Sequence, residues 1–356
     1  MSDIKHFSLF KILFGLIVFA VSESNGNAQG CSDAGLCSFG SLNLMRTRYV
    51  IIQPDEVKLT AVDVKDSTPL FLGDYNKDYY TIRQVVMDSG AFSRLMNVEF
   101  TSYYGKAMEG NASVFINQLE GNFRITERRL FGQIKIPYSI ISGNLGTTNG
   151  LSDVTMSLSY VAIENRKINL SFAGGVKIPA NNANLSLNNR PLPMVYQTSL
   201  GSTDLLLGSR FSYKKWDFTV GYQHSLNANE NRYQHISGIS DSTIYNGYFE
   251  SNGLRRYDDG LFRINRKYNI SKVSINTGLL FIYHLQDDDI TNPLGERVKA
   301  TGSKGLTLNL NLAGSIPINK NTELTIILAK PVIQRKNVPD GLARSFVGII
   351  GLKRNF

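Results

Sequence analysis

Asp153-Val154-Thr155-Met156-Ser157-Leu158-Ser159-Tyr160 alternates between polar and apolar residues without a break. Successive side chains of a β-strand point to opposite sides, so a strand with one apolar and one polar face has this period of two. An amphipathic helix would repeat about every 3.6 residues. The segment therefore predicts a strand that separates an apolar environment from a hydrophilic one.

The same alternation recurs along most of the chain and predicts twelve strands. They lie near residues 97–107, 113–124, 129–141, 152–163, 167–178, 202–213, 216–226, 256–267, 271–285, 304–315, 322–334 and 344–356. Short connections alternate with long ones, so the long ones all fall at the same end of the sheet. Transmembrane barrels have this arrangement, with periplasmic turns and longer extracellular loops.

The composition favours a membrane barrel over a soluble sandwich. Of the 356 residues 42% are hydrophobic and 19% are charged, and apart from one short N-terminal run the hydrophobic residues are dispersed. Most predicted strands have at least the nine to eleven residues that a tilted strand needs to cross a bilayer. Aromatic residues gather near strand ends, as in the interfacial girdle of a barrel: Tyr138, Tyr160, Tyr213, Trp216, Tyr283 and Phe356. We therefore expect an all-β fold, an up-and-down antiparallel transmembrane β-barrel of the cell outer membrane.

The N-terminal quarter of the chain lacks this rhythm. Residues 1–28 combine a basic start, a ten-residue apolar run and a small-residue site ending at Ala28, which predicts a signal peptide. Residues 29–95 are punctuated by proline and aspartate, and we expect a periplasmic or plug segment there, before a barrel over residues 96–356. If two pieces of that segment joined the barrel, the strands would number fourteen.

Three single residues carry further predictions. Cys31 and Cys37 are the only cysteines, and an exported chain in an oxidising compartment would join them in a disulfide. Acylation of Cys31 is the alternative. The final predicted strand ends on Phe356, an aromatic C-terminus of the kind that outer-membrane barrels present to the barrel assembly machinery.

Three motifs carry a resemblance to a known family: Gly150-Leu151-Ser152-Asp153-Val154, Lys177-Ile178-Pro179 at the end of a strand, and Gly201-Ser202-Thr203-Asp204. Together they resemble the outer-membrane barrels of the MetA-pathway phenol-degradation family, relatives of the FadL-type channels for hydrophobic compounds. Ser152 departs from the glycine that is common there. The start of the predicted mature chain is also similar to exported barrels of Bacteroidetes-type bacteria. The resemblance implies passive movement of small, often hydrophobic molecules across the outer membrane.

The polar faces of the predicted strands would line the lumen of such a barrel. The residues expected to line it are Thr155, Ser157, Asn169, Lys177, Arg210, Gln223, Lys272, Asn276, Asn309 and Asn311. They make a polar and modestly basic interior, which fits either an open channel or a narrow interior filled by its own side chains. The sequence thus predicts an outer-membrane channel for small hydrophobic or amphipathic solutes. A non-conducting structural or secretion-assembly barrel is the alternative.

No motif indicates covalent chemistry, and we expect no enzyme activity, cofactor or metal site. His224 and Ser225 are neighbours on a predicted strand and point to opposite faces, so they cannot form a nucleophile–base pair. The run Asp287-Asp288-Asp289 is interpreted as a solvated loop. The net charge of +9 resides largely on lysines and arginines near strand ends, which favours outer-membrane lipid and lipopolysaccharide as partners, with a small-molecule cargo and no nucleic acid.

Overall fold

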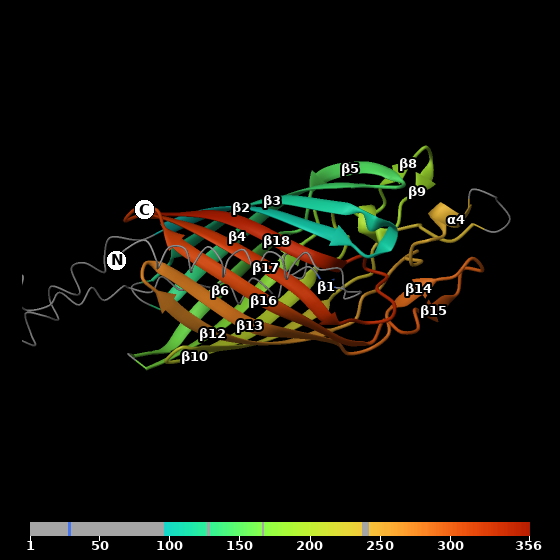
Figure 1. The fold of residues 1–356 in the computed structure, drawn as a ribbon. Coiled ribbons are helices and arrows are strands. Elements are labelled where there is room, and N and C mark those ends of the chain that lie inside the picture. Colours follow the sequence, from blue (N-terminus) through green and yellow to red (C-terminus); the bar gives the residue numbers. More distant parts are fainter. Residues whose placement is uncertain (1–27, 30–95, 127–128, 166, 237–241) are drawn as a thin grey trace, which may run out of the picture. The chain divides into compact units, whose positions relative to one another are not determined.

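Twelve long strands form the fold in a computed structural model of the protein (Figure 1). The structure describes residues 96–126, 129–165, 167–236 and 242–356, together with the backbone of residues 28 and 29. The long strands are β2 (Met96–Ala107), β3 (Ser113–Arg124), β4 (Leu130–Gly143), β6 (Val154–Glu164), β7 (Ile168–Ile178), β10 (Asp204–Tyr213), β11 (Trp216–Ser225), β12 (Asp259–Ile270), β13 (Val273–His284), β16 (Gly305–Pro317), β17 (Thr322–Ile333) and β18 (Ala343–Asn355). The all-β prediction is confirmed.

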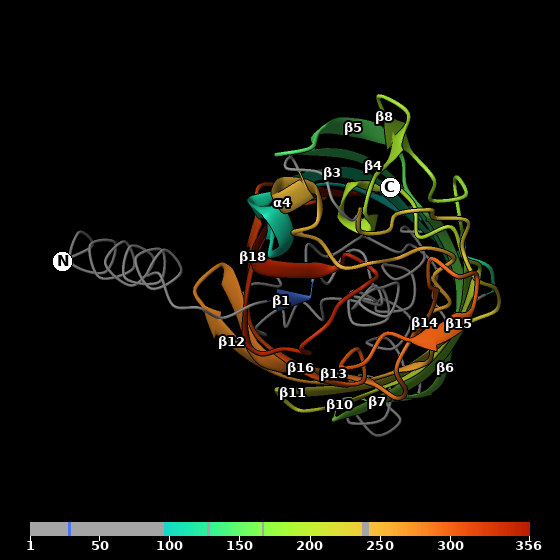
Figure 2. The same ribbon diagram turned by 90° about the vertical axis from the view of Figure 1, so that its right-hand side faces the viewer.

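Each long strand pairs antiparallel with the strands before and after it, and the last pairs with the first. β18 lies against β2 in a register that joins Val347 to Gly105 and Leu352 to Phe100. This pairing closes the sheet into a barrel, seen down its axis in Figure 2. Because β18 meets β2 directly, the barrel has twelve strands, and the fourteen-strand alternative is wrong.

The two ends of the barrel differ in their connections. At one end, here called the short-turn end, strands join through two to five residues, as at Lys214–Lys215 between β10 and β11. At the other, the long-loop end, the connections between β7 and β10, β11 and β12, and β13 and β16 each exceed fifteen residues (Figure 1). The predicted sorting of short and long connections is confirmed. In other outer-membrane barrels the longer loops face the cell exterior.

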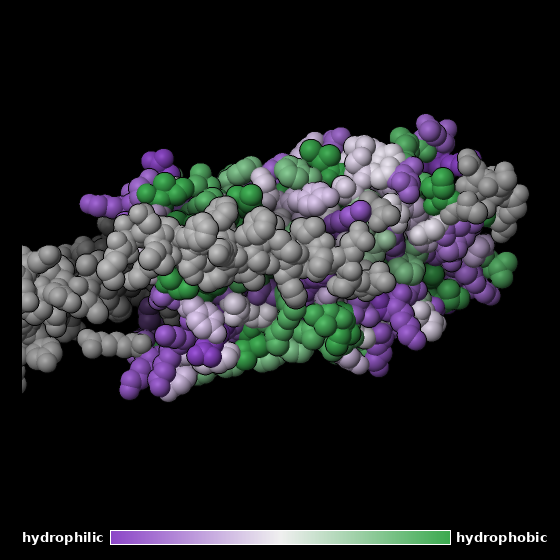
Figure 3. Space-filling view, viewed as in Figure 1, coloured by the Kyte–Doolittle hydropathy of each residue, from purple (hydrophilic) through white to green (hydrophobic). Residues whose placement is uncertain are grey.

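Apolar side chains cover the outside of the barrel. On β6, Leu158 is 53% exposed whereas its neighbour Ser157 is 6% exposed, and large apolar side chains are exposed on the outer face of the other long strands as well. Hydrophobic residues gather along the barrel wall, and hydrophilic ones gather near the two ends (Figure 3). A soluble protein would bury these apolar side chains, so the outward band is the surface of a transmembrane barrel of the outer-membrane type.

Smaller elements decorate the long-loop end. The strand β5 (Gly146–Leu151) pairs with β4. Two small hairpins are formed by β8 (Ser186–Leu187) with β9 (Arg190–Pro191) and by β14 (Asp289–Thr291) with β15 (Arg297–Lys299). The other elements are the 3-10 turns η2 (Glu109–Asn111) and η3 (Met194–Tyr196) and the short helix α4 (Ser242–Tyr245). A two-residue strand, β1 (Ala28–Gln29), pairs with the start of β18. Among the described residues, no helix is both long and apolar enough to span a membrane.

The long loops have a hydrophobic core of their own. Tyr196, Tyr233, Tyr245 and Tyr248 pack together with the ends of β2, β3 and β4. A second cluster joins Met194 and other apolar residues of the β7–β10, β11–β12, β13–β16 and β17–β18 loops. The loops therefore pack against one another instead of standing apart in solvent.

One predicted turn needs correction, and some other predictions concern residues that the structure does not describe. The predicted turn at residues 268–270 is wrong, because β12 continues to Ile270 and the turn falls at Ser271 and Lys272. Ser271 adopts a positive φ of 53°, which lets two residues reverse the chain. The predicted signal peptide up to residue 27, the Cys31–Cys37 disulfide and residues 30–95 of the predicted periplasmic or plug segment lie outside the described residues.

Candidate functional site

The inner wall of the barrel carries polar side chains on most strands, together with buried apolar residues such as Leu206, Leu261, Leu280 and Ile282. On β6, Thr155, Ser157 and Ser159 are buried, whereas Met156 and Leu158 between them are exposed on the outside. The pleat of each strand fixes this division, because neighbouring side chains must take opposite faces. The interior is therefore built from one face of each strand.

Nine of the ten residues predicted to line the lumen lie on this inward face. Five are buried: Thr155, Ser157, Lys177, Gln223 and Asn309. Four are partly buried: Asn169, Arg210, Asn276 and Asn311. Lys272 is the exception, since it lies in the turn between β12 and β13 and is exposed there, so its placement on a strand was wrong. Contact of any of them with a solute stays a prediction.

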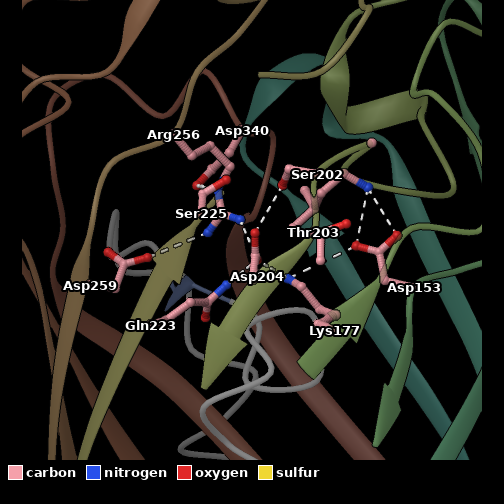
Figure 4. A network of polar contacts seen from close by, with 12 residues as sticks. Asp153, Lys177, Ser202, Thr203, Asp204, Gln223, Ser225, Arg256, Asp259 and Asp340 are labelled. Atoms are coloured by element: carbon pink, nitrogen blue, oxygen red, sulfur yellow. Dashed lines mark hydrogen bonds and ion pairs between the residues drawn. The ribbon is translucent and has the colours of Figure 1, made fainter. Parts of the chain in front are cut away.

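A buried carboxylate, Asp204, is the centre of a polar network at the long-loop end (Figure 4). Its Oδ2 lies 2.9 Å from Nζ of Lys177 on β7 and 3.0 Å from Nη1 of Arg256. Gln223 on β11 donates a hydrogen bond to the same oxygen, and Ser202 donates to Oδ1 at 3.0 Å. A fully buried carboxylate is costly unless it is paired and hydrogen-bonded, and Asp204 has both kinds of partner.

Arg256, from the loop before β12, joins Asp204 to two further carboxylates. Its Nη2 lies 3.4 Å from Asp259, and its Nε lies 3.6 Å from Asp340 in the β17–β18 loop. Burial would lower the pKa of Arg256, but Asp204, Asp340 and Asp259 outweigh it and raise the pKa above its ordinary value. Arg256 therefore stays charged and holds three elements together.

Asp340 has a second cationic partner, because Nη2 of Arg335 lies 3.3 Å from it. Burial would raise the pKa of Asp340, yet Arg335 and Arg256 together hold it below its usual value. Arg335 also donates a hydrogen bond of 3.0 Å to the backbone oxygen of Ser303. The β17–β18 loop is thus tied to the β11–β12 and β13–β16 loops by charge-assisted bonds.

His284, the last residue of β13, extends the network on the other side of Asp259. Its Nδ1 lies 2.8 Å from Asp259, and its Nε2 lies 2.8 Å from Asp288. An ionised carboxylate only accepts hydrogen bonds, so a ring that meets one at each nitrogen donates from both, which is the imidazolium form. Asp288 is buried, and its placement corrects the interpretation of Asp287-Asp288-Asp289 as a solvated loop.

The network reaches across the barrel. In the closed order of strands β10 lies six positions from β18, which is the opposite wall. Asp340 precedes β18, and through Arg256 it is connected to Asp204 on β10. The β17–β18 loop therefore extends from one wall toward the other at the long-loop end.

Two loop segments, residues 192–202 and 338–344, are buried at every position. Their backbones approach closely at Gly341, where an added Cβ would lie 2.4 Å from the backbone nitrogen of Val195. Gly341 also has a φ of +66°, which L side chains rarely adopt. Here the close approach and the backbone conformation both require glycine.

A small cavity lies between these two segments and the barrel wall. Its volume is about 60 Å³, enough for a few water molecules. Val114, Ile116 and Ile141 from β3 and β4 form an apolar side, and Thr155 and Lys177 from β6 and β7 form a polar side. At its polar end Asp153 accepts hydrogen bonds from Oγ of Ser199 at 2.5 Å and from the backbone of Leu200.

Sequence reasoning identified Lys177 and Gln223 but missed the charged residues that they meet. Asp204 belongs to one of the motifs that carried the family resemblance. Its acidic side chain at the start of an alternating strand is the sequence feature that could have identified it as a buried carboxylate. Arg256, Asp340 and Arg335 lie in loops, where no periodicity distinguishes a buried ion from a solvated one.

Comparison with known proteins supports the fold. No protein-family model matches the chain, and no curated protein sequence matches it. The structure is similar to the COG4313 outer membrane channel from Pseudomonas putida F1, with a TM-score of 0.52 and 14% sequence identity over 74% of this chain and 96% of that chain. The KdgM porin matches with a TM-score of 0.39 and 8% identity over 73% of this chain and 99% of that chain. The translocator domain of the autotransporter NalP from Neisseria meningitidis matches with a TM-score of 0.38 and 10% identity over 79% of this chain and 96% of that chain. The outer-membrane barrel fold is confirmed, whereas the phenol-degradation family and the Bacteroidetes source stay predictions.

Proposed function

We propose that this barrel is an outer-membrane channel through which small hydrophobic or amphipathic solutes cross passively. The observation that carries the proposal is the two-sided lining of the cavity at the long-loop end. Val114, Ile116 and Ile141 offer an apolar wall, and Lys177 and Thr155 face it with polar groups. Binding sites for organic molecules combine a mostly apolar lining with a few placed polar groups.

In the present conformation the cavity is too small for such a solute. An apolar protein cavity that holds benzene measures about 150 Å³, against about 60 Å³ here. Passage of an organic molecule through this cavity therefore requires the segments 192–202 and 338–344 to move apart. The ion pairs of Arg256 with Asp204 and Asp340 oppose that movement.

The close packing of the loops favours a second candidate, a non-conducting structural or secretion-assembly barrel. In that function the loops would stay packed, and the network around Arg256 would only stabilise the fold. The two functions differ in whether solute crosses a bilayer that contains the protein.

Liposome swelling with purified protein distinguishes them. The probes are benzenesulfonate, an aromatic anion that does not cross lipid unaided, and arabinose, a sugar of similar size. A channel for amphipathic solutes admits benzenesulfonate several-fold faster than arabinose, because only the former has groups for both sides of the cavity.

The variant Arg256→Met tests the loops within the same assay. Loss of the guanidinium removes the ion pairs to Asp204, Asp259 and Asp340, and we expect faster entry of both probes. Arg255→Met, at the exposed neighbouring position, is the matched control. If folded wild-type protein and Arg256→Met both leave the liposomes impermeable, the non-conducting function is correct.

A further inference from the structure

At the short-turn end, aromatic and basic side chains form a cluster on the outside of β10, β11 and β12. This aromatic–basic patch consists of Tyr213, Lys214, Lys215, Trp216, Arg266 and Tyr268. The guanidinium of Arg266 lies 5.1 Å from the ring centre of Trp216 and 5.3 Å from that of Tyr268. The ammonium of Lys214 lies 5.1 Å from the ring centre of Tyr213. Arg266 and Lys214 are therefore held against aromatic rings at the edge of the membrane band.

Backbone hydrogen bonds bring several basic turns together at this place. The amide of Lys214 donates to the backbone oxygen of Lys167 at 3.0 Å, and the amide of Lys267 donates to that of Lys215 at 2.8 Å. The turns of β6–β7 and β10–β11 and the end of β12 thus form one row of cations. In the described part of the chain, Lys167, Lys214, Lys215 and Arg266 make no ion pair with a carboxylate.

Acidic residues near the row do not neutralise it. Asp217 lies on the inward face of β11, where it pairs with Arg210 at 2.9 Å. Glu164, at the end of β6, is the exposed carboxylate nearest in sequence to Lys167. One carboxylate beside four cations leaves a net positive surface, and such a surface attracts an anionic partner.

Apolar rings lie next to the patch on the same outer face. Phe218 stacks on Trp216 with ring centres 6.4 Å apart, and Phe211 stacks on Phe218 at 6.2 Å. These rings belong to the apolar band that meets the hydrocarbon of the membrane. A partner that contacts both the cations and the rings must therefore have an anionic head and a hydrocarbon tail.

We propose that the aromatic–basic patch is a binding site for an anionic phospholipid of the inner, periplasmic leaflet. The phosphate lies against Arg266 and Lys214, and the acyl chains lie along Trp216, Phe218 and Phe211. Arginine suits this role because stacking orients its planar group, and its N–H donors at the edge match phosphate oxygens. Lipopolysaccharide, which occupies the leaflet at the long-loop end, does not reach the site.

Trp216 is the only tryptophan of the chain, so its fluorescence reports on this site alone. Full-length protein is placed in vesicles of phosphatidylcholine, and a small fraction of the lipid is replaced by phosphatidylglycerol or phosphatidylcholine with brominated acyl chains, which quench tryptophan on contact. We expect brominated phosphatidylglycerol to quench at a several-fold lower fraction than brominated phosphatidylcholine. The preference weakens with added salt.

Arg266→Gln keeps the tryptophan and removes the stacked charge, and we expect it to reduce the preference about fivefold, which corresponds to about 1 kcal/mol for one cation at a membrane surface. Arg129→Gln is the matched control, an exposed arginine at the same end but in the β3–β4 turn. Its preference remains that of the wild type.

Three results would overturn the proposal. The first is equal quenching of the wild type by the two brominated lipids. The second is an equal loss of preference in Arg266→Gln and Arg129→Gln, which would mean that only the total charge matters. The third is displacement of brominated phosphatidylglycerol by lipopolysaccharide as effectively as by unlabelled phosphatidylglycerol.

Discussion

The two ends of this barrel treat charge in opposite ways. At the short-turn end Lys214, Lys215 and Arg266 are exposed beside aromatic rings, where water and lipid headgroups can solvate them. At the long-loop end Asp204 and Arg256 are almost completely buried, and they pair with each other. Charge at the short-turn end is therefore available to the surroundings, whereas charge at the long-loop end fastens the loops to the barrel.

This difference predicts a difference in tolerance to mutation. An exposed cation can be removed at little cost in stability, because water replaces its interactions. Removing one partner of a buried ion network leaves the others unpaired in a low-dielectric interior, which is strongly destabilising.

The largest effect is expected from Arg256→Met. It leaves Asp204, Asp259 and Asp340 short of a buried cation, and we expect the free energy of unfolding to fall by about 3–5 kcal/mol. Urea unfolding in lipid vesicles measures this loss. Arg255→Met changes the exposed neighbour and should cost less than about 0.5 kcal/mol. Equal losses in the two variants would contradict the contrast between buried and exposed charge.

Leu158→Arg tests the outward band. Leu158 is exposed in the middle of β6, and an arginine near the centre of the bilayer costs about 2–4 kcal/mol in a barrel of this type. Leu187→Arg, at an exposed leucine of the β8–β9 hairpin outside the barrel wall, should change the unfolding free energy by less than about 0.5 kcal/mol. If Leu158→Arg were as harmless as Leu187→Arg, the outer face of β6 would not meet lipid.

Gly341→Ala tests the close approach of the two buried loop segments. Its Cβ would meet the backbone of Met194 and Val195, so the loops must separate. Gly295→Ala is the matched control, because Gly295 also has a positive φ but an added Cβ would find no atom within 4 Å. Both variants bear backbone strain, and overpacking should make Gly341→Ala less stable than the control by about 2 kcal/mol. Equal unfolding free energies would show that the segments are not closely packed.

The smallest effect concerns pH. Because Arg335 and Arg256 hold the pKa of Asp340 below its ordinary value of 3.8, its ionised form stabilises the folded loop. This contribution is complete above pH 3.8 and is lost as the pH falls toward the lowered pKa. Unfolding measured below pH 5 should therefore show a steeper loss of stability with acid in the wild type than in Asp340→Asn. Identical pH slopes would mean that Asp340 is not ion-paired in the folded protein.

The sequence was sufficient to predict the barrel because the fold depends on a local pattern. The alternation around Leu158 requires only that neighbouring side chains take opposite faces, and each of the twelve predicted strands is present with shifts of a few residues at its ends. The wrong placement of Lys272 arose from reliance on the same local pattern, because the two-residue turn at Ser271 interrupts the alternation very little.

The network around Arg256 could not be predicted in this way. Its members lie far apart in sequence, as Asp204, Arg256 and Asp340 do, and the folded loops alone bring them together. A buried aspartate in a loop has the same sequence signal as a solvated one, which is why Asp288 was assigned to solvent. Whether a charged loop residue is buried in this protein depends on how the loops fold together, not on the local sequence.

The accessibility of spin labels along β6 in lipid vesicles tests most directly whether the apolar face of the strands is turned outward to lipid. Single labels at positions 154 to 161, on a background without Cys31 and Cys37, are exposed to oxygen, which concentrates in lipid, and to a water-soluble nickel complex. We expect high oxygen accessibility at Val154, Met156, Leu158 and Tyr160 and low values at the positions between them. Uniform values along the strand, or oxygen maxima at Thr155, Ser157 and Ser159, would contradict an apolar outer face around a polar interior.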